Sequence, residues 1–112
     1  MSILLEFAMF PTSDDCRSGN NSSSVGKQVS KIIDMIDNSG VKYQLTPMGT
    51  IIEVETIKEA LNIVEKAYEF LSDCERVYSI LKFDIRKNKQ NRLKQKIESV
   101  KKHLHKDINA TN

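Results

Sequence analysis

The stretch 43–55 constrains the fold more than any other part of the chain, because it predicts a β-hairpin. Its turn falls at Pro47-Met48-Gly49, where proline resists joining a strand ladder and glycine accepts the backbone angles of a tight reversal. Side chains alternate between the two faces of a strand, so Thr50 is expected on one face and Glu53 on the other. A lone carboxylate in an apolar strand needs a partner, because burying it without one is costly.

The rest of the chain supplies the elements that such a hairpin needs around it. A strand is predicted at 3–10, a helix from Val25 to the glycine at position 40, a second helix after the capping box Thr56-Glu59, and a strand at 76–86. This order predicts an α+β fold, a ferredoxin-like βαββαβ sandwich in which an antiparallel sheet carries its helices on one face. We expect an additional C-terminal helix, and one domain over 1–112 with a flexible loop at 12–24 and a frayed tail at 107–112.

Periodicity also predicts which side chains these elements share. In the second helix the apolar spacing marks a stripe of Ile57, Leu61, Val64, Tyr68 and Leu71. In the last strand one face is expected to hold Val77, Ser79, Leu81, Phe83 and Ile85. The C-terminal helix has only a narrow stripe of Leu93, Ile97, Val100 and Leu104, which we expect to dock on a neighbouring subunit.

Composition and charge favour some classes of protein over others. The net charge of +2 is too small to indicate a nucleic-acid partner, and the basic run at 86–106 has no interleaved aromatic residues. No apolar run reaches the roughly 18 residues of a membrane span, and the N-terminal strand does not resemble a signal peptide. Cys16 and Cys74 match no metal or redox spacing, so we expect free thiols and a cytoplasmic location.

The face of the predicted sheet away from the helices is unusual for a monomer. Central pairing of the first and third strands would bring Glu6 and Glu53 beside each other on this face. Its other residues are mainly apolar and comprise Leu4, Ala8, Phe10, Ile51, Tyr78 and Ile80. Because so much apolar area should not face water, we expect self-association, sheet face against sheet face or through the third helix.

Several of these side chains could bind a small molecule. Carboxylates suit a cationic or hydrogen-bond-donating ring, and Thr46 and Thr50 offer hydroxyls at the hairpin. Phe10 and Tyr78 could stack on a flat heterocycle, although both could equally belong to an interface. Glu6 and Glu53 could instead be paired structurally with Lys82 or Arg76.

With its residues laid out in this way, the chain resembles the small thiamine-binding protein family. The turn Met48-Gly49-Thr50 together with Glu53 is the most specific match. The other matching stretches are Leu4–Pro11, Ser24-Val25 with Val29, Tyr43–Pro47, Arg76–Tyr78 and Lys96–Val100. The chain departs from the family pattern in a longer loop after Pro11, in Gln28 in place of an aromatic residue, and in Asp84-Ile85-Arg86 in place of a more acidic sequence.

The resemblance implies a ferredoxin-like homotetramer that binds thiamine or its hydroxymethylpyrimidine half without catalysing a reaction. We therefore expect no enzyme activity, no cofactor and no metal, and a ligand pocket at a subunit interface near the hairpin. The expected ligand-binding residues are Glu53, Thr50, Gly49, Thr46, Glu6, Phe10 and Tyr78. The alternatives are a nucleic-acid-binding module that uses the basic C-terminal helix, and an enzyme with Glu53 as general base, for which no second catalytic group is evident.

Overall fold

A computed structural model of the chain describes residues 1–12 and 24–104. Residues 13–23 of the predicted loop and the predicted tail at 107–112 lie outside this description. The elements follow in the order β1 (Ser2–Pro11), α1 (Ser24–Ser39), β2 (Lys42–Thr46), β3 (Gly49–Val54), α2 (Ile57–Glu69), β4 (Val77–Arg86) and α3 (Arg92–Leu104). This order, with four antiparallel strands, confirms the ferredoxin-like α+β fold with an added C-terminal helix.

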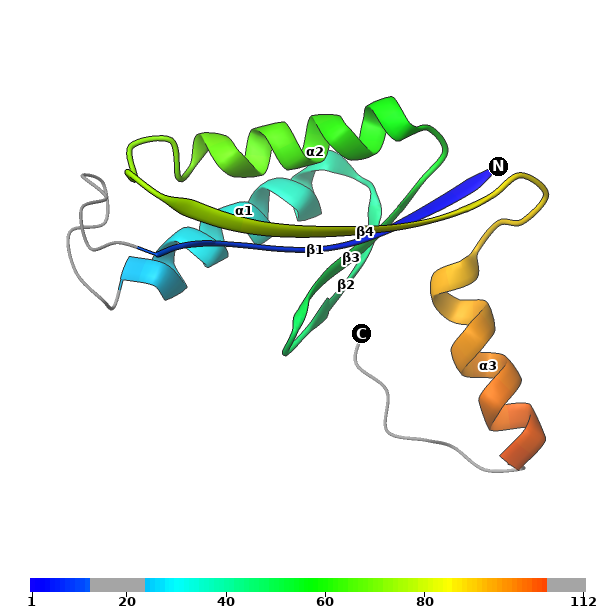
Figure 1. The fold of residues 1–112 in the computed structure, drawn as a ribbon. Helices are drawn as coiled ribbons and strands as arrows, with labels where there is room; N and C mark the ends of the chain where they lie inside the picture. The colour runs from blue at the N-terminus through cyan, green and yellow to red at the C-terminus, as the bar shows by residue number, and fades with distance from the viewer. Residues whose placement is uncertain (13–23, 105–112) are drawn as a thin grey trace.

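The sheet has the strand order β2-β3-β1-β4, so β1 lies in the centre between β3 and β4. Helices α1 and α2 both cover one face, whereas α3 stands apart from them (Figure 1). The core lies between the sheet and these two helices. It is formed mainly by Ile3, Leu5, Phe7, Ile32, Ile36, Ile52, Val54, Ile63 and Leu71.

Local signals account for the ends of the helices. The predicted capping box is confirmed: the Thr56 hydroxyl accepts a hydrogen bond from the Glu59 N–H at 3.0 Å and donates one to Glu59 Oε1 at 3.2 Å. After α1, Gly40 takes a φ of 83°, and its N–H donates to the Asp37 carbonyl at 3.4 Å. A glycine in this left-handed conformation ends a helix without steric strain.

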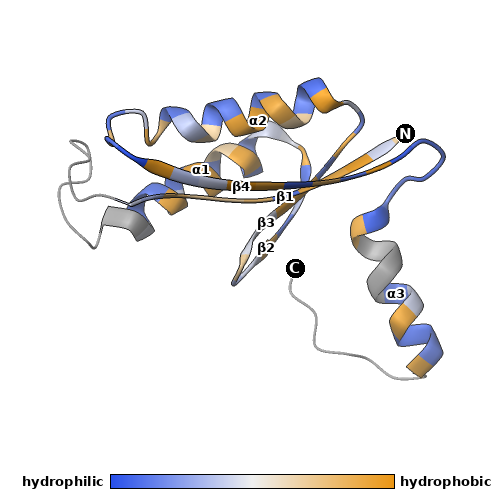
Figure 2. Ribbon diagram, in the orientation of Figure 1, coloured by the Kyte–Doolittle hydropathy of each residue, from blue (hydrophilic) through white to orange (hydrophobic). Residues whose placement is uncertain are grey.

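The predicted stripe of α2 is wrong at three of its five positions, whereas Val64 packs against the core and Leu71 is buried. Buried positions on α2 are Ala60, Ile63 and Ala67, while Ile57, Leu61 and Tyr68 are exposed. The two alanines are small enough to let the helix approach the sheet closely, and the larger side chains flank the contact. Figure 2 shows hydrophobic and hydrophilic residues intermixed along α2.

Strand β4 alternates between its two faces as predicted, but most of its residues are exposed. Its helix-side residues Leu81, Phe83 and Ile85 are exposed, and so are Tyr78 and Ile80 on the opposite face. The strand lies at the edge of the sheet, and within the described residues it pairs only with β1. A long edge strand with apolar side chains on both faces is a ready template for pairing with another chain.

Cys74 corrects the expectation of free thiols. It is buried beside the core and is disulfide-bonded. Cys16 lies outside the described residues. The state of Cys74 therefore gives no support to a reducing compartment, which the expected free thiols would have indicated.

Candidate functional site

The β2–β3 turn is held in a fixed shape by its own hydrogen bonds. The Thr46 hydroxyl donates to the Gly49 carbonyl at 2.8 Å and accepts from the Met48 N–H at 3.2 Å. Gly49 is required by contact with the neighbouring strand, because a Cβ there would lie 2.8 Å from the Phe7 carbonyl oxygen. The turn is thus pressed closely against β1.

A cavity of about 380 Å³ opens between this turn, α1 and the end of β1. This size is within the range of small-molecule sites, roughly 300–1,000 Å³. Its walls are apolar apart from two threonines, and none of the described residues that line it is charged. They are Phe7, Ala8, Met9, Phe10, Val29, Ile32, Ile33, Leu45, Thr46, Pro47, Met48, Gly49 and Thr50.

The cavity brings together four of the predicted ligand-binding residues, namely Phe10, Thr46, Gly49 and Thr50. Thr50 is only 7% exposed, and among the described residues its hydroxyl makes no hydrogen bond. Because side chains alternate along β3, Thr50 faces the helices and Glu53 faces the other side. The structure therefore separates these two predicted residues by the thickness of the sheet.

Glu53 lies instead at the N-terminus of α3. Its Oε2 accepts hydrogen bonds from the Ser2 hydroxyl at 2.6 Å and from the Arg92 N–H at 3.0 Å, and its Oε1 accepts from the Leu93 N–H at 3.4 Å. The carboxylate thus satisfies N–H groups that have no partner within the helix, and its charge complements the helix dipole.

Arg92 completes this polar cluster. Its buried guanidinium donates to the Ser2 hydroxyl at 3.0 Å and to the Ser2 carbonyl at 2.8 Å, and it also donates to the Asp84 carbonyl. It forms an ion pair with the Asp84 carboxylate at 2.8 Å. We call Ser2, Glu53, Asp84 and Arg92 the α3 anchor, because they join α3 to three strands of the sheet.

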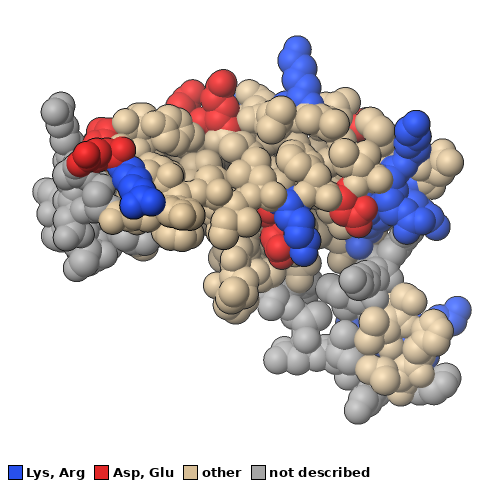
Figure 3. Space-filling view, in the orientation of Figure 1, with Lys and Arg blue, Asp and Glu red and all other residues tan. Residues whose placement is uncertain are grey.

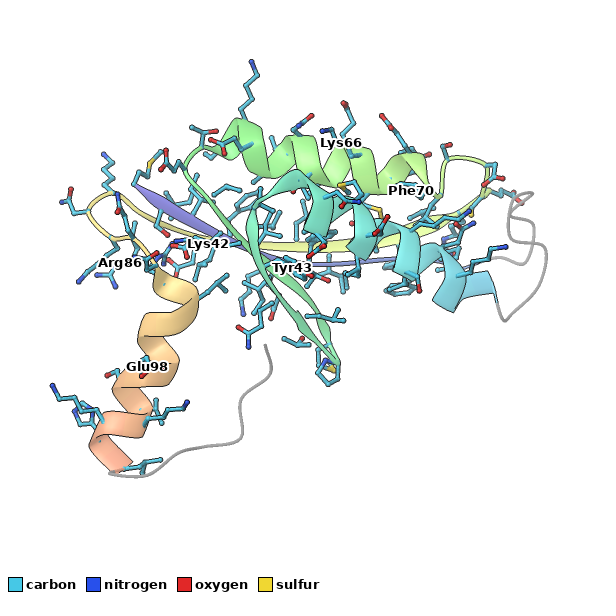
Figure 4. All side chains as sticks on the ribbon, turned by 180° about the vertical axis from the view of Figure 1, so that it is seen from behind. Lys42, Tyr43, Lys66, Phe70, Arg86 and Glu98 are labelled. Carbon is cyan, nitrogen blue, oxygen red and sulfur yellow. The ribbon has the colours of Figure 1, made fainter. Side chains whose placement is uncertain are left out.

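The electrostatics of Glu53 follow from this position. Desolvation raises the pKa of Glu53, but the hydrogen bonds from Ser2, Arg92 and Leu93 and the charge of Lys42 outweigh it, so the pKa lies below its usual value. Figure 4 labels Lys42 on β2, and its ammonium group also donates to Asn91 just before α3. A rise in pKa, which two carboxylates in close contact would produce, is not found for Glu53.

Glu6 has a partner of its own. Its carboxylate pairs with Lys82 of β4 at 3.7 Å, one of the alternatives that the sequence left open. In the β1–β3 register Glu6 lies opposite Ile51, and Glu53 lies opposite Leu4. The two carboxylates share a face of the sheet but are not directly paired. On the face of the molecule seen in Figure 3, charged side chains are scattered, with uncharged surface between them.

Phe10 and Tyr78 lie opposite each other on β1 and β4. Their rings are stacked with centroids 6.2 Å apart and an interplanar angle of 13°. The Arg76 guanidinium lies 5.3 Å from the centroid of the Tyr78 ring, within the distance of a cation–π contact. Tyr78 is therefore occupied by protein partners, while Phe10 also borders the cavity.

Sequence reasoning missed two groups of residues. The cavity wall formed by Val29, Ile32 and Ile33 has helical spacing in the sequence, which does not distinguish a pocket from ordinary core. Arg92 was read as part of a basic surface, and no local signal connects it with Ser2 or Asp84. Among residues 1–12 and 24–104, no cluster of three or more potential metal ligands is found, and none of the helices there is long and apolar enough to cross a membrane.

The sequence profile of the thiamine-binding protein family matches residues 6–101. The chain belongs to this family. A UPF0045 protein of Methanothermobacter thermautotrophicus is 32% identical over 88 residues, which cover 77% of this chain and 89% of that protein. The UPF0045 protein YqgV of Bacillus subtilis is 39% identical over 79 residues, covering 68% and 75% of the two chains.

Solved structures agree with the fold. The hypothetical protein MJ1052 of Methanocaldococcus jannaschii has a TM-score of 0.70 at 29% identity, covering 88% of this chain and 95% of that one. A Thermotoga maritima protein provisionally assigned to thiamine biosynthesis or salvage has a TM-score of 0.70 at 17% identity, covering 89% and 99%. At that identity the second likeness shows the fold alone.

Proposed function

We propose that this chain is a non-catalytic, cytoplasmic binding protein for thiamine or its hydroxymethylpyrimidine half. The observation that carries the proposal is the cavity beside the hairpin turn, which gathers Phe10, Thr46, Gly49 and Thr50 in a member of the thiamine-binding protein family. The provisional assignment of the Thermotoga maritima structure to thiamine biosynthesis or salvage is consistent with it.

The chemistry of the cavity suits one end of thiamine. A flat pyrimidine can lie against the apolar walls, and the Thr50 hydroxyl can exchange a hydrogen bond with it. The cationic thiazolium then lies at the mouth, where Phe10 and Met48, which are 39% and 85% exposed, border the cavity. Glu53 is not needed in this arrangement, because its oxygens already accept hydrogen bonds at α3.

We further propose that the protein assembles as a homo-oligomer, a tetramer being the simplest form, and that the pocket lies at an interface. Two observations support assembly. The edge strand β4 exposes Tyr78, Ile80, Leu81, Phe83 and Ile85, and the rim of the cavity exposes Met48, whose side chain is 85% accessible. A second subunit would cover this apolar area.

Calorimetric titration with thiamine, hydroxymethylpyrimidine and a short RNA tests the function. We expect the two small molecules to bind and the RNA, included because α3 ends on Lys101, Lys102 and His103, to show no affinity. Absence of binding by both small molecules would refute the proposal, and tight, salt-sensitive RNA binding would favour the nucleic-acid alternative.

A pair of variants then decides which face of the sheet holds the ligand. Thr50→Val removes a hydroxyl on the helix side, and Glu53→Gln removes a charge on the opposite side. We expect Thr50→Val to weaken thiamine binding and Glu53→Gln to leave it unchanged. If Glu53→Gln weakens thiamine binding and Thr50→Val does not, the ligand binds on the helix-free face. Glu53 would then be a ligand-binding residue, as the sequence predicted.

A further inference from the structure

Large apolar side chains of α2 and β4 form a surface that stays exposed in the single chain. Helix α1 connects β1 to β2 and α2 connects β3 to β4, so right-handed crossovers set α2 toward the β4 edge of the sheet. With Ala60 and Ala67 toward the sheet, the right-handed turn of α2 places its exposed apolar residues on the flank away from α1, on the side of β4. We call these residues and the exposed helix-side residues of β4 the α2–β4 surface: Ile57, Leu61, Tyr68, Leu81, Phe83 and Ile85.

Helix α3 carries an apolar stripe of its own. Leu93, Val100 and Leu104 are seven and four positions apart, which places them on one face of the helix. Val100 is 40% exposed and Leu104 is 49% exposed. This stripe does not cover the α2–β4 surface of its own chain. Glu53 holds the start of α3 on the opposite face of the sheet, and the helix points away from α2 (Figure 1).

Charge is divided between the same two regions. Positions 82–106 hold ten lysines and arginines and two acidic residues, a net charge of +8, so the rest of the chain carries −6 of the total of +2. The stretch 55–75, which contains α2, holds six acidic residues and two lysines. One of them, Glu65, is exposed and lies four positions after Leu61 and three before Tyr68, beside the apolar flank of α2. The basic α3 therefore complements the region of α2 in charge as well as in hydrophobicity.

We propose that α3 of one copy docks on the α2–β4 surface of a second copy. An amphipathic helix that lays its apolar face on a hydrophobic surface is a recurrent mode of recognition. The two contacts are related by a twofold axis, so each copy gives one helix and receives one. The inference names a contact within the proposed assembly and rests on that proposal.

The division of charge favours a second copy over the other partners of a basic amphipathic helix. A nucleic acid or an anionic membrane attracts α3 but repels the remainder of the chain, which carries −6. A second copy attracts α3 through that same acidic remainder. The contact should therefore weaken as salt concentration rises, because exposed charges on both sides contribute to it.

Sedimentation of two variants tests each side of the contact. Val100→Asp puts a negative charge into the stripe of α3, and Leu61→Lys puts a positive charge on the α2–β4 surface. Both positions are exposed in the single chain, so the fold should survive. We expect each variant to raise the dissociation constant of the assembly at least about tenfold. The matched controls Ser99→Asp and Asn62→Lys introduce the same charges at exposed neighbouring positions outside the two apolar faces, and they should assemble as the parent does.

Mixing the two variants then distinguishes a helix-to-surface contact from pairing of like with like. A mixed pair has one intact α3 and one intact α2–β4 surface on different copies, so association should recover in part. Mixing cannot restore a contact between two α3 helices or between two α2–β4 surfaces, because one member of each pair is altered. If a charge unfolds a variant, Val100→Ser or Leu61→Asn takes its place, with the same direction expected.

The outcomes separate this inference from the proposed assembly. An oligomeric parent whose assembly is unchanged in both single variants, or does not recover on mixing, would overturn the inference and leave the proposed assembly standing. A parent that sediments as a monomer would overturn both. Binding of the parent to vesicles of phosphatidylcholine and phosphatidylserine that is lost in Val100→Asp would assign the stripe to a membrane and overturn the inference.

Discussion

The α3 anchor leads to a prediction about local stability. Replacing Glu53 with Gln keeps the size of the side chain but removes the charge that faces the N-terminus of α3. Replacing it with Ala also removes the acceptors for the Ser2 hydroxyl and the Arg92 N–H. Both changes should loosen α3 from the sheet and leave the core unaltered, because Glu53 lies on the face away from α1 and α2.

The magnitude follows from the contacts that are lost. Loss of a helix cap costs about 0.5–2 kcal/mol, and loss of a charge near a helix N-terminus costs about 0.3–1 kcal/mol. Glu53 is only partly buried, so solvent screening keeps the values toward the middle of these ranges. We expect the free energy that holds α3 on the sheet to fall by about 1 kcal/mol in Glu53→Gln and by about 2 kcal/mol in Glu53→Ala. The population of detached α3 should then rise roughly fivefold and thirtyfold, respectively.

Hydrogen exchange is the appropriate assay, because a helix attached mainly through its first turn opens without global unfolding. Amide protection in α3 should fall by those factors, while protection in β1 and β3 stays unchanged. Glu55→Gln is the matched control, since that exposed carboxylate lies two residues further on. Equal protection of α3 in all three proteins would refute the assignment of Glu53 as the cap of this helix.

The same carboxylate makes the attachment of α3 dependent on pH. The pKa of Glu53 in the folded protein lies below the ordinary value of 4.5. The stability that the ionised carboxylate gives to the attachment of α3 is therefore fully present above pH 4.5 and is lost as the pH falls through the folded pKa. Protection of α3 should therefore decline below pH 4.5 more in the parent than in Glu53→Gln. Comparing the two proteins at each pH isolates the titration of Glu53, because Asp84, Arg92 and Lys42 are present in both.

Two further predictions concern the turn and the exposed edge. Gly49→Ala should destabilise the protein by about 1–3 kcal/mol in thermal unfolding, because the new methyl group would lie 2.8 Å from the Phe7 carbonyl oxygen. Gly26→Ala in α1, which meets nothing within 4 Å, should be neutral or stabilising, and equal losses in both would contradict the close-contact argument. Ile80→Asp should shift sedimentation from oligomer to folded monomer, because Ile80 is 60% exposed in the single chain and is buried only if subunits associate. An unchanged oligomer would show that this face of β4 is not an interface.

How much of this molecule the sequence predicts depends on the range of the interaction. The hairpin turn and the capping box at Thr56 rest on neighbouring residues, and both were predictable. The phase of α2 was not, because Ala60 and Ala67 add little to an apolar pattern although both are fully buried in the core. The fold class followed from the order of elements and not from any single stripe.

The site was harder to predict than the fold because it depends on register. Glu53 was recognisable as a carboxylate that needs a partner, but its partners lie 51 positions earlier, at Ser2, and 39 positions later, at Arg92. The cavity beside the end of β1 depends on the extension of β1 past the last pair with β3. Neither relation is visible in local spacing, since both follow from how separate strands align.

The central place of β1 also bears on how fast the protein folds. Its two neighbours are synthesised long after it, and the pairing of Ser2 with Arg86 joins residues near opposite ends of the described chain. Each such contact requires closure of a large loop before it contributes any stabilising energy, and chains dominated by distant contacts fold slowly. Until β4 arrives, β1 remains an unpaired apolar strand on one side, so the nascent chain is most prone to aggregation in the interval between the synthesis of β3 and that of β4.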